Sequence, residues 1–300
     1  MNILVTGGSG FIGRNIVKLL KEEGNTVATL DIKDKNSVAD YHIMSDVRNL
    51  HMVQNASKGM DYVFHLAAVT SPPEFENPLG EGYSVNVLGT YNVLAASAAN
   101  GVKRVILASS SSIYGSTSKP SREDSPTGSF SNLYPLSKRI NEMTAHFFLT
   151  HNVETVSLRY FNTYGIGENS KGTYSSVIWK FIESIKGDKR PVIFGDGKQS
   201  RDFIYVEDTA RASVLAMYYG VPGEMYNVGT GKSIDFNTIF GIVKDETGYE
   251  GDPEYVPVPF KSYQTFTLAD MAKTRRELKF EMKYDVREGV RAILNAGNSG

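Results

Sequence analysis

The sequence contains no cysteine, which excludes disulfide bonds, iron–sulfur clusters, thiolate zinc sites and a cysteine nucleophile. It also lacks an excess of charge, because 32 Lys plus Arg oppose 33 Asp plus Glu, so nothing marks a nucleic-acid binder. No apolar run approaches the roughly 18 residues of a membrane span, and the N-terminus carries no basic signal-peptide stretch. The five histidines show no metal-ligand spacing. We therefore expect a cytoplasmic protein that acts on a small molecule, without metal, nucleic acid or membrane.

The first 165 residues alternate short, β-branched apolar runs with longer helical patterns. They predict strands at 3–5, 26–30, 62–66, 105–108 and 155–159 and helices at 11–23, 83–100 and 134–150. This alternation is typical of βαβ units, so we predict an α/β fold with a doubly wound parallel sheet covered on both faces. After residue 165 the pattern is less regular, which indicates a smaller second lobe. The Ser-, Pro- and Gly-rich residues 115–132 are expected to form a loop that acts as a lid.

A glycine-rich turn, Thr6-Gly7-Gly8-Ser9-Gly10-Phe11-Ile12-Gly13, follows the first predicted strand. Glycines at such a turn let a phosphate approach the backbone N–H groups, and the following helix N-terminus adds partial positive charge. Asp31 stands about 20 residues further on, where its carboxylate would accept hydrogen bonds from ribose hydroxyls and repel a 2′-phosphate. The pattern therefore predicts NAD rather than NADP, the alternative being a tight turn without a ligand.

Tyr134 and Lys138 stand four residues apart at the start of a predicted helix, and so on one face of it. An ammonium beside a phenol stabilises the phenolate and lowers a pKa that is ordinarily about 10. Taken alone, the spacing is just as typical of an exposed helix face. The order of the other motifs favours the chemical interpretation.

Six motifs occur in one order: the glycine-rich turn, Asp31, His65-Leu66-Ala67-Ala68, Ser109-Ser110-Ser111-Ser112-Ile113-Tyr114-Gly115, the Tyr134–Lys138 pair and Leu158-Arg159-Tyr160-Phe161-Asn162. From Asn2 to about Ala296, the chain resembles the extended short-chain dehydrogenase/reductases, the NAD-dependent nucleotide-sugar epimerase/dehydratase family. The resemblance implies a Rossmann NAD-binding domain at 1–165 and a smaller C-terminal α/β substrate domain at 166–300, with some segments returning to the first. It also implies bound NAD, a nucleotide-sugar substrate with UDP favoured, and a homodimer formed through the helices at 83–100 and 134–150.

The resemblance assigns roles position by position. Catalytic roles fall on Ser110, Tyr134 and Lys138. Cofactor contacts fall on Gly7, Gly10, Phe11, Ile12, Gly13, Asp31, Ile32, Asp46, Val47, Leu66, Ala67, Ala68, Val69, Asn86, Tyr134, Lys138, Tyr160 and Phe161. Substrate contacts fall on Ser110, Ser111, Asn162, Lys171, Tyr174, Val177, Val192, Phe194, Arg201 and Tyr263. Among these, Arg201 is expected on the substrate diphosphate, since guanidinium donates two parallel hydrogen bonds.

Ser111 and Ser112 indicate which of the family's reactions this chain catalyses. The family's 4,6-dehydratases carry an Asp-Glu pair, and its decarboxylating members a glutamate, where this chain has Ser111-Ser112. The resemblance therefore favours an epimerase, in which Tyr134, assisted by Ser110, takes a sugar hydroxyl proton while hydride passes to NAD and later returns. Two alternatives are a net oxidoreductase and a dinucleotide-binding regulator without turnover, and the latter typically loses the tyrosine or lysine.

Two kinds of epimerase stay open. Residues 173–178 resemble the substrate segment of UDP-sugar 4-epimerases, and UDP-glucose/UDP-galactose 4-epimerase is the preferred assignment. Residues 170–172 together with 263–270 resemble ADP-heptose 6-epimerases, in which a lysine at the place of Lys171 is a second acid/base. Those enzymes prefer NADP, which Asp31 disfavours. Lys261 replaces an arginine that many UDP-sugar epimerases carry before residue 263.

Some of these features also have plainer interpretations. The serines at 109–112 fit a polar strand end, and Arg201-Asp202 fits a surface ion pair. His65 is predicted to be a packed strand-end residue rather than a base. Trp179 and residues 217–226 are expected in the core, and the charged run at 273–279 on an exposed helix face.

Overall fold

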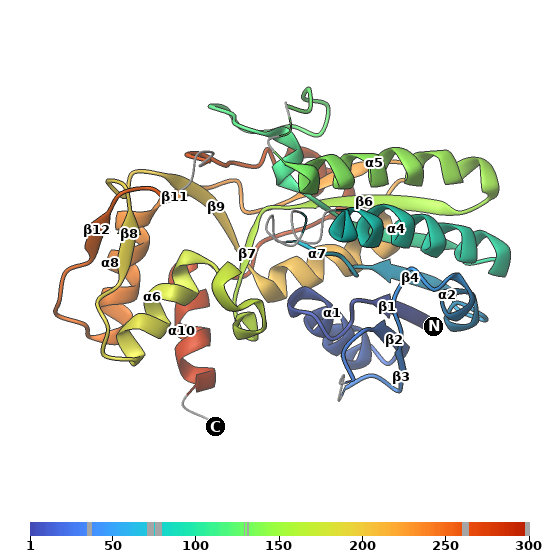
Figure 1. The fold of residues 1–300 in the computed structure, drawn as a ribbon, viewed down its shortest axis with the longest axis horizontal. Helices are drawn as coiled ribbons and strands as arrows, with labels where there is room; N and C mark the ends of the chain where they lie inside the picture. Colours follow the sequence, from blue (N-terminus) through green and yellow to red (C-terminus); the bar gives the residue numbers. More distant parts are fainter. Residues whose placement is uncertain are drawn as a thin grey trace.

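The computed structural model describes residues 1–34, 38–70, 75, 80–128, 130, 132–259 and 264–297. Its largest element is a seven-stranded parallel sheet in the order β10-β6-β5-β4-β1-β2-β3 (Figure 1). Its strands are β1 (Asn2–Thr6), β2 (Thr26–Asp31), β3 (Tyr41–Met44), β4 (Tyr62–His65), β5 (Arg104–Ser110), β6 (Glu154–Tyr160) and β10 (Met225–Val228). This sheet confirms the predicted α/β fold of the Rossmann type.

Helices cover both faces of the sheet (Figure 1). They are α1 (Phe11–Glu22), α2 (Leu50–Ala56), α4 (Glu81–Asn100), α5 (Leu133–Phe148), α7 (Val206–Tyr219) and α9 (Ala272–Leu278). One apolar core contains Ile16 and Leu20 of α1 together with Met217 of α7. Another contains Val93 of α4 and Ala145 of α5. Apolar residues at helical spacing thus bury one side of each helix against the strands.

Most of the elements after β6 form a second group around a third apolar core that includes Phe181, Phe240 and Val290. Three strands, β11 (Ser233–Asp235), β9 (Ser200–Tyr205) and β7 (Asn162–Tyr164), make one sheet, and β12 (Glu254–Val256) pairs with β8 (Val192–Phe194). The helices are η3 (Glu168–Tyr174), α6 (Val177–Lys186), α8 (Phe236–Thr247) and α10 (Val286–Gly297). The division of the chain at residue 165 stays a prediction, and α7 and β10 pack with the first group.

The three predicted helices correspond to α1, α4 and α5 and end within two residues of the predicted bounds. The sequence patterns do not predict β3, a short edge strand with partly exposed side chains. Residues 217–226 belong only partly to the core, because Tyr226 is fully buried whereas Tyr218 and Tyr219 are 44 % and 46 % exposed at the end of α7. The charged residues of α9 are exposed or half-buried, as predicted, while Thr274 and Leu278 face the interior.

The loop predicted as a lid, residues 115–132, is bonded to the rest of the molecule. Ser121 is buried, its N–H donates to the carbonyl of Leu268 at 2.8 Å, and its carbonyl accepts from the N–H of Asp270 at 2.9 Å. Further along, the Gly128 N–H donates to the Ile113 carbonyl at 3.1 Å. These bonds tie the described part of the loop to neighbouring segments, and its role as a lid stays a prediction; residues 129 and 131 lie outside the described residues.

Candidate active site

The glycine-rich turn joins β1 to α1 and leaves no room for side chains. Gly7 has a φ of +72°, and a Cβ at this position would lie 2.5 Å from the backbone nitrogen of Ala67. A Cβ at Gly13 would lie 2.2 Å from the carbonyl oxygen of Gly7. Since α1 begins at Phe11, the unpaired N–H groups of its first turn lie beside this hollow. A turn of this shape fits the pyrophosphate of a dinucleotide.

A cavity of about 420 Å³ extends from this turn along the ends of β2 and β4. Asp31 is buried there, and its two carboxylate oxygens accept hydrogen bonds from the N–H groups of Ser9 and Lys33, each at 3.0 Å. Asp46 pairs with Arg48 at 2.6 Å, which lowers the pKa of the Asp46 carboxyl. The predicted cofactor residues lining this cavity are Gly7, Gly10, Asp31, Ile32, Asp46, Val47, Leu66, Ala67, Ala68 and Val69. Apolar walls with carboxylates at one end fit the adenosine half of NAD.

Asn86, a predicted cofactor residue, does not line either of the two site cavities among the described residues. Its side chain is fully buried and exchanges two hydrogen bonds with the backbone of Val69, at 2.8 Å and 3.0 Å. It also donates to the hydroxyl of Ser137 at 3.0 Å. The structure thus gives Asn86 an indirect role, because it holds the wall at Val69 against α5.

The three catalytic candidates line a second cavity of about 670 Å³, which begins at the same glycine-rich turn. Ser110 ends β5, and its Oγ accepts a hydrogen bond from the Ser112 N–H at 3.1 Å. Tyr134 lies in the first turn of α5, and Lys138 lies one turn later. The buried Nζ of Lys138 donates to the Ala108 carbonyl at 2.8 Å and lies 5.9 Å from the centre of the Tyr134 ring. One strand end and one helix thereby bring a hydroxyl, a phenol and an ammonium to the same cavity.

Burial has the largest effect on the pKa values of both Lys138 and Tyr134. It lowers the pKa of Lys138 to about 8, and the Glu142 carboxylate opposes this change. Burial also raises the pKa of Tyr134, while the hydrogen bond with Ser110 acts in the opposite direction. The predicted lowering of the Tyr134 pKa is therefore not found, because burial outweighs the hydrogen bond with Ser110. Further positive charge in the cavity would be needed to favour the phenolate.

His65 lies behind these residues at the end of β4. Its Nδ1 is 2.7 Å from the Thr6 hydroxyl and its Nε2 is 2.9 Å from the Thr90 hydroxyl. Burial and the charge of Lys138 lower the pKa of His65 to about 3. A buried, neutral and fully bonded imidazole agrees with the prediction of a packed residue.

Another wall of the second cavity comes from segments that follow β6. Arg201 on β9 is buried, with its guanidinium carbon 5.7 Å from the centre of the Phe236 ring. It donates to the Ser200 carbonyl at 2.9 Å and to the Gln264 carbonyl. The predicted substrate residues that line the cavity are Ser110, Asn162, Lys171, Tyr174, Val177 and Arg201, and further cofactor residues there are Phe11, Ile12, Gly13, Tyr160 and Phe161. The arginine is held by neighbouring backbone and so reaches the cavity in a defined position.

Other predicted substrate residues are not brought to this cavity. Ser111 lies in η1 (Ser111–Tyr114), directly after the strand end. Val192 and Phe194 lie on β8, where Ile193 between them enters the third core, so their side chains point to the other face. The nucleobase role assigned to that strand stays a prediction. Tyr263 lies outside the described residues.

Comparisons with known proteins agree with this geometry. The model of the NAD dependent epimerase/dehydratase family matches residues 3–229 of the chain. The chain belongs to this family. A protein of Methanocaldococcus jannaschii provisionally named UDP-glucose 4-epimerase is 34 % identical, with 98 % of this chain and 97 % of the relative covered. An ADP-L-glycero-D-manno-heptose-6-epimerase of Alkalilimnicola ehrlichii is 30 % identical, with 98 % and 97 % covered.

A solved structure extends the likeness to the whole fold. The UDP-glucose 4-epimerase of Thermotoga maritima, determined with UDP-glucose, superposes with a TM-score of 0.93 and 31 % identity over 100 % of this chain and 99 % of that chain. The protein is accordingly an enzyme of the nucleotide-sugar epimerase family, an isomerase that acts with NAD.

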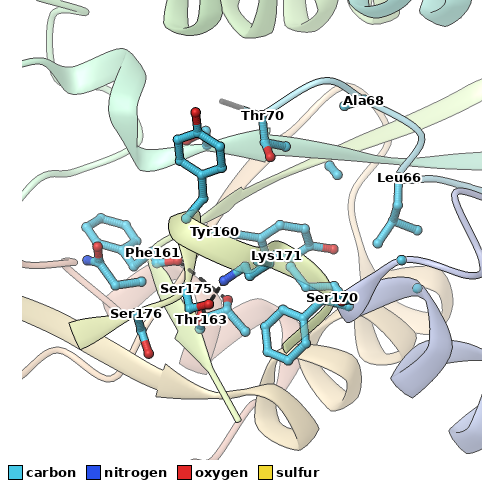
Figure 2. A pocket seen from close by; sticks show the side chains of 18 of the residues that line it. Leu66, Ala68, Thr70, Tyr160, Phe161, Thr163, Ser170, Lys171, Ser175 and Ser176 are labelled. Carbon is cyan, nitrogen blue, oxygen red and sulfur yellow. Dashed lines mark hydrogen bonds between the residues drawn. The ribbon is translucent and has the colours of Figure 1, made fainter. Parts of the chain in front are cut away.

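Glu168 is a buried partner of the cavity residue Lys171 that the sequence patterns do not reveal. It is fully buried in η3, and its carboxylate accepts hydrogen bonds from Lys171 Nζ at 2.8 Å and from the Ser176 N–H at 2.6 Å. Lys171 also donates to the Thr163 carbonyl at 3.3 Å and lies 4.5 Å from the centre of the Phe11 ring. Figure 2 shows this lysine reaching into the cavity toward Thr163. An acid three residues before Lys171 was the only signal for this pair.

Within the part of the chain that the structure describes, no group of histidine and acidic side chains is arranged to hold a metal ion. Across those same residues, no helix combines the length and apolar character needed to span a bilayer. The prediction of a cytoplasmic location stays a prediction.

Proposed function

We propose that this enzyme is a UDP-sugar 4-epimerase that interconverts UDP-glucose and UDP-galactose through a 4-keto intermediate. One observation carries the proposal: Ser110, Tyr134 and Lys138 line the same cavity as the glycine-rich turn and Arg201. A hydroxyl, a phenol and an ammonium beside a dinucleotide site are the groups needed for reversible oxidation of an alcohol. The likeness to UDP-glucose 4-epimerases supports this choice of substrate.

Each group of the catalytic candidates has a defined task. Bound NAD supplies the hydride acceptor, the returning hydride donor and a positively charged nicotinamide ring. Tyr134 removes the proton of the sugar C4 hydroxyl, and Ser110 donates a hydrogen bond that stabilises the phenolate. Lys138, protonated below a pKa of about 8, adds positive charge and holds the nicotinamide ribose. After the keto sugar turns in the site, hydride would add to its opposite face and Tyr134 would return the proton, so that C4 is inverted without net oxidation.

The remaining predicted residues divide between cofactor and substrate. The glycine-rich turn would hold the pyrophosphate, Asp31 the adenosine ribose, and Asp46 with Val47 the adenine. Leu66 to Val69 would line the inner phosphate and ribose, and Tyr160 with Phe161 the nicotinamide. Arg201 is proposed to bind the substrate diphosphate, aided by Asn162, since a buried guanidinium makes strong paired hydrogen bonds to phosphate oxygens.

Lys171 supports a second candidate, an ADP-heptose 6-epimerase. It lines the same cavity as Tyr134, as a second acid/base would. Its ammonium, however, donates hydrogen bonds to the buried carboxylate of Glu168 at 2.8 Å and to the Thr163 carbonyl at 3.3 Å, so it is already held by groups of the protein. Asp31 also disfavours the 2′-phosphate of NADP. These contacts favour the 4-epimerase.

We also propose that the enzyme is a homodimer formed through α4 and α5. Tyr91, Met143 and Phe147 are 50 %, 60 % and 59 % exposed, and with Ile140 and Phe148 they line a groove of about 320 Å³. An exposed apolar patch of this kind typically marks an interface. Light scattering should give twice the chain mass, and Phe147→Glu should give a monomer, whereas the control Tyr219→Glu at the end of α7 should not.

A substrate panel tests the proposed activity. The purified enzyme, without added NAD, is incubated separately with UDP-glucose, UDP-galactose, UDP-glucuronic acid, ADP-heptose, GDP-mannose and dTDP-glucose, and products are identified by NMR. We expect UDP-glucose and UDP-galactose to converge on one mixture from either side. Conversion of ADP-heptose alone would replace the proposal with the 6-epimerase, and accumulation of NADH with a keto sugar would indicate a net oxidoreductase.

A further inference from the structure

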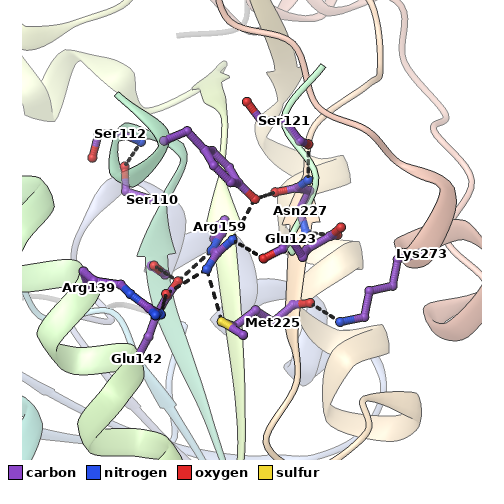
Figure 3. A network of polar contacts seen from close by, with 12 residues as sticks. Ser110, Ser112, Ser121, Glu123, Arg139, Glu142, Arg159, Met225, Asn227 and Lys273 are labelled. Carbon is purple, nitrogen blue, oxygen red and sulfur yellow. Dashed lines mark hydrogen bonds and ion pairs between the residues drawn. The ribbon is translucent and has the colours of Figure 1, made fainter. Parts of the chain in front are cut away.

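An ion pair between Glu142 and Arg159 lies inside the molecule (Figure 3). Both side chains are 1 % exposed, and the carboxylate accepts hydrogen bonds from the guanidinium at 2.8 Å and 2.9 Å. Neither residue is among those lining the two site cavities. A pair buried to this degree generally adds little net stability, because lost hydration offsets the attraction. Its other contacts indicate what it does.

The carboxylate bonds helix α5 to the end of strand β5. Glu142 follows Lys138 by four residues and Tyr134 by eight, so the three side chains share one face of the helix. Its Oε1 also accepts a hydrogen bond from the hydroxyl of Ser109 at 2.7 Å, directly before Ser110 in the chain. The helix with the phenol and the ammonium is thereby tied to the strand end with the hydroxyl.

The guanidinium holds the same segment from its other end. Arg159 Nη1 donates to Tyr114 Oη at 2.9 Å, and Tyr114 Oη donates to Asn227 Oδ1 at 2.7 Å. Tyr114 is the last residue of η1, which begins directly after Ser110. Ser109 and Tyr114, on either side of Ser110, are therefore both hydrogen-bonded to the same ion pair.

We propose that Glu142 and Arg159 are positioning residues that set the distance from Ser110 to Tyr134 and Lys138. The inference rests on the proposed function, because it assigns the ion pair to the geometry of that site. The reaction rate depends on the distances between the catalytic groups and the sugar hydroxyl. Moving a catalytic group by about 1 Å lowers the rate roughly a hundredfold. The ion pair is bonded to residues 109–114 at Ser109 and at Tyr114, and Glu142 itself belongs to α5. These contacts oppose a shift of the segment relative to the helix.

Glu142 acts on the site through its charge as well. Lys138 Nζ is faced by Glu142 and Tyr134 from α5, by His65 from β4 and by the Ala108 carbonyl from β5. The Glu142 carboxylate raises the pKa of Lys138, whereas burial lowers it to about 8. Removing the carboxylate charge should lower this pKa further, so the ammonium would lose its proton at a lower pH.

The test replaces the carboxylate by an amide in Glu142→Gln, which keeps an acceptor oxygen but leaves Arg159 without its counter-charge. The matched control is Glu154→Gln, because Glu154 pairs with Arg104 at 2.6 Å across the opposite end of the same two strands. Hydrogen–deuterium exchange of residues 109–114 measures positioning without turnover. The pH profiles of kcat and KM measure its consequence.

We expect Glu142→Gln to accelerate exchange of residues 109–114 about tenfold or more. It should lower kcat about 10- to 100-fold while KM changes less than about threefold, and the basic limb of the kcat profile should move to lower pH. Ser109→Ala removes one hydrogen bond and no charge, so it serves even where Glu142→Gln does not fold. It should lower kcat about three- to tenfold without moving the basic limb. The control should leave every value within about twofold.

If hydrogen–deuterium exchange of residues 109–114 is unchanged in Glu142→Gln, the inference is overturned. If Glu142→Gln does not fold, the same result in Ser109→Ala overturns it. A loss of kcat in Glu142→Gln with an unmoved basic limb also overturns it, because that result identifies a purely structural pair. Tyr134→Phe in the same assay tests the proposed function separately. If that variant turned over normally, the proposed base would be wrong, while the exchange data would still decide whether the ion pair fixes the segment.

Discussion

The dinucleotide region and the substrate region of this enzyme are built in different ways. The predicted pyrophosphate turn of the first is one continuous stretch, residues 6–13, where a Cβ at Gly7 or Gly13 would lie 2.5 Å or less from backbone atoms. The second is assembled from separate segments, and Arg201 owes its position to the Gln264 carbonyl and the Phe236 ring. A local motif dictates the turn at the centre of the cofactor side, whereas tertiary packing dictates the substrate side. Substitutions should therefore damage the two sides differently.

Tyr134 lies where the two regions meet, so Tyr134→Phe should cause the largest loss. The change removes the ionisable hydroxyl and keeps the ring, which packs edge-on against Phe75 at 6.0 Å. General-base catalysis contributes roughly 10²- to 10⁴-fold, and kcat should fall by that factor or more while bound NAD is retained. Steady-state kinetics with cofactor quantification checks this. Retention of more than about a tenth of the wild-type kcat would remove Tyr134 from its assigned role.

On the substrate side, Arg201→Ala should weaken binding more than chemistry. Hydrogen bonds to charged groups contribute about 1.5–3 kcal/mol, so KM should rise about 10- to 100-fold while kcat falls much less. NAD content should not change, because the cofactor turn is independent of this arginine. Arg276→Ala, which removes an exposed cation paired with Glu277, is the control and should be silent. A loss of kcat at constant KM would contradict the diphosphate assignment.

On the cofactor side, Gly13→Ala should lower the content of bound NAD, which Arg201→Ala is expected to leave unchanged. Its methyl group would meet the Gly7 carbonyl at 2.2 Å, so the turn must distort at a cost of about 1–3 kcal/mol. We expect at least a tenfold loss of co-purified NAD, measured after denaturation, and a lower Tm. Gly241→Ala on α8, where a Cβ meets nothing within 4 Å, is the matched control and should be neutral. Full NAD content in Gly13→Ala would break the proposed contrast between the two regions.

The ionisation of Lys138 predicts a graded effect of pH. Its pKa of about 8 means that the ammonium is present below that pH and is lost above it. Because the phenolate of Tyr134 needs this positive charge, kcat should halve near pH 8 and fall about tenfold by pH 9. A pH profile of kcat at saturating substrate measures this limb. A rate that keeps rising through pH 9 would show that Lys138 is not required as a cation.

The smallest effect is expected at Lys171, where the two epimerase assignments differ. A guanidinium keeps its charge and cannot exchange protons at neutral pH, so Lys171→Arg should retain kcat within about threefold in a 4-epimerase. The same variant should inactivate a 6-epimerase that uses this lysine as an acid/base. Lys171→Ala should additionally lower Tm, since it leaves the buried Glu168 without its partner. Collapse of Lys171→Arg to the level of Tyr134→Phe would favour the 6-epimerase.

The contrast between regions also explains what the sequence can predict. α1, α4 and α5 and the inner strands follow from periodicity, because each buries a continuous apolar face. The glycine-rich turn and Asp31 follow from a motif whose geometry is local. Arg201 and Lys171 are found only through the resemblance, yet both do line the cavity.

What the sequence misses depends on contacts between distant segments. Glu168 appears as an ordinary acid until folding buries it beneath Lys171. Val192 and Phe194 do not line the cavity, because the twofold alternation of β8 turns Ile193 into the core, and their nucleobase role stays a prediction. Glu142 and Arg159 meet only when α5 packs on β5 and β6, and no spacing in the chain links them. Such pairings are set by tertiary packing rather than by local pattern.

The most direct test of the account follows a label on the sugar. UDP-glucose carrying deuterium at C4 is incubated with the enzyme in ordinary water without added NAD, and the UDP-galactose formed is examined by NMR. If Tyr134 moves only the proton while hydride leaves and returns within one site, the product retains deuterium at C4. Loss of the deuterium to water, or its accumulation in released NADH, would contradict the proposed internal hydride return.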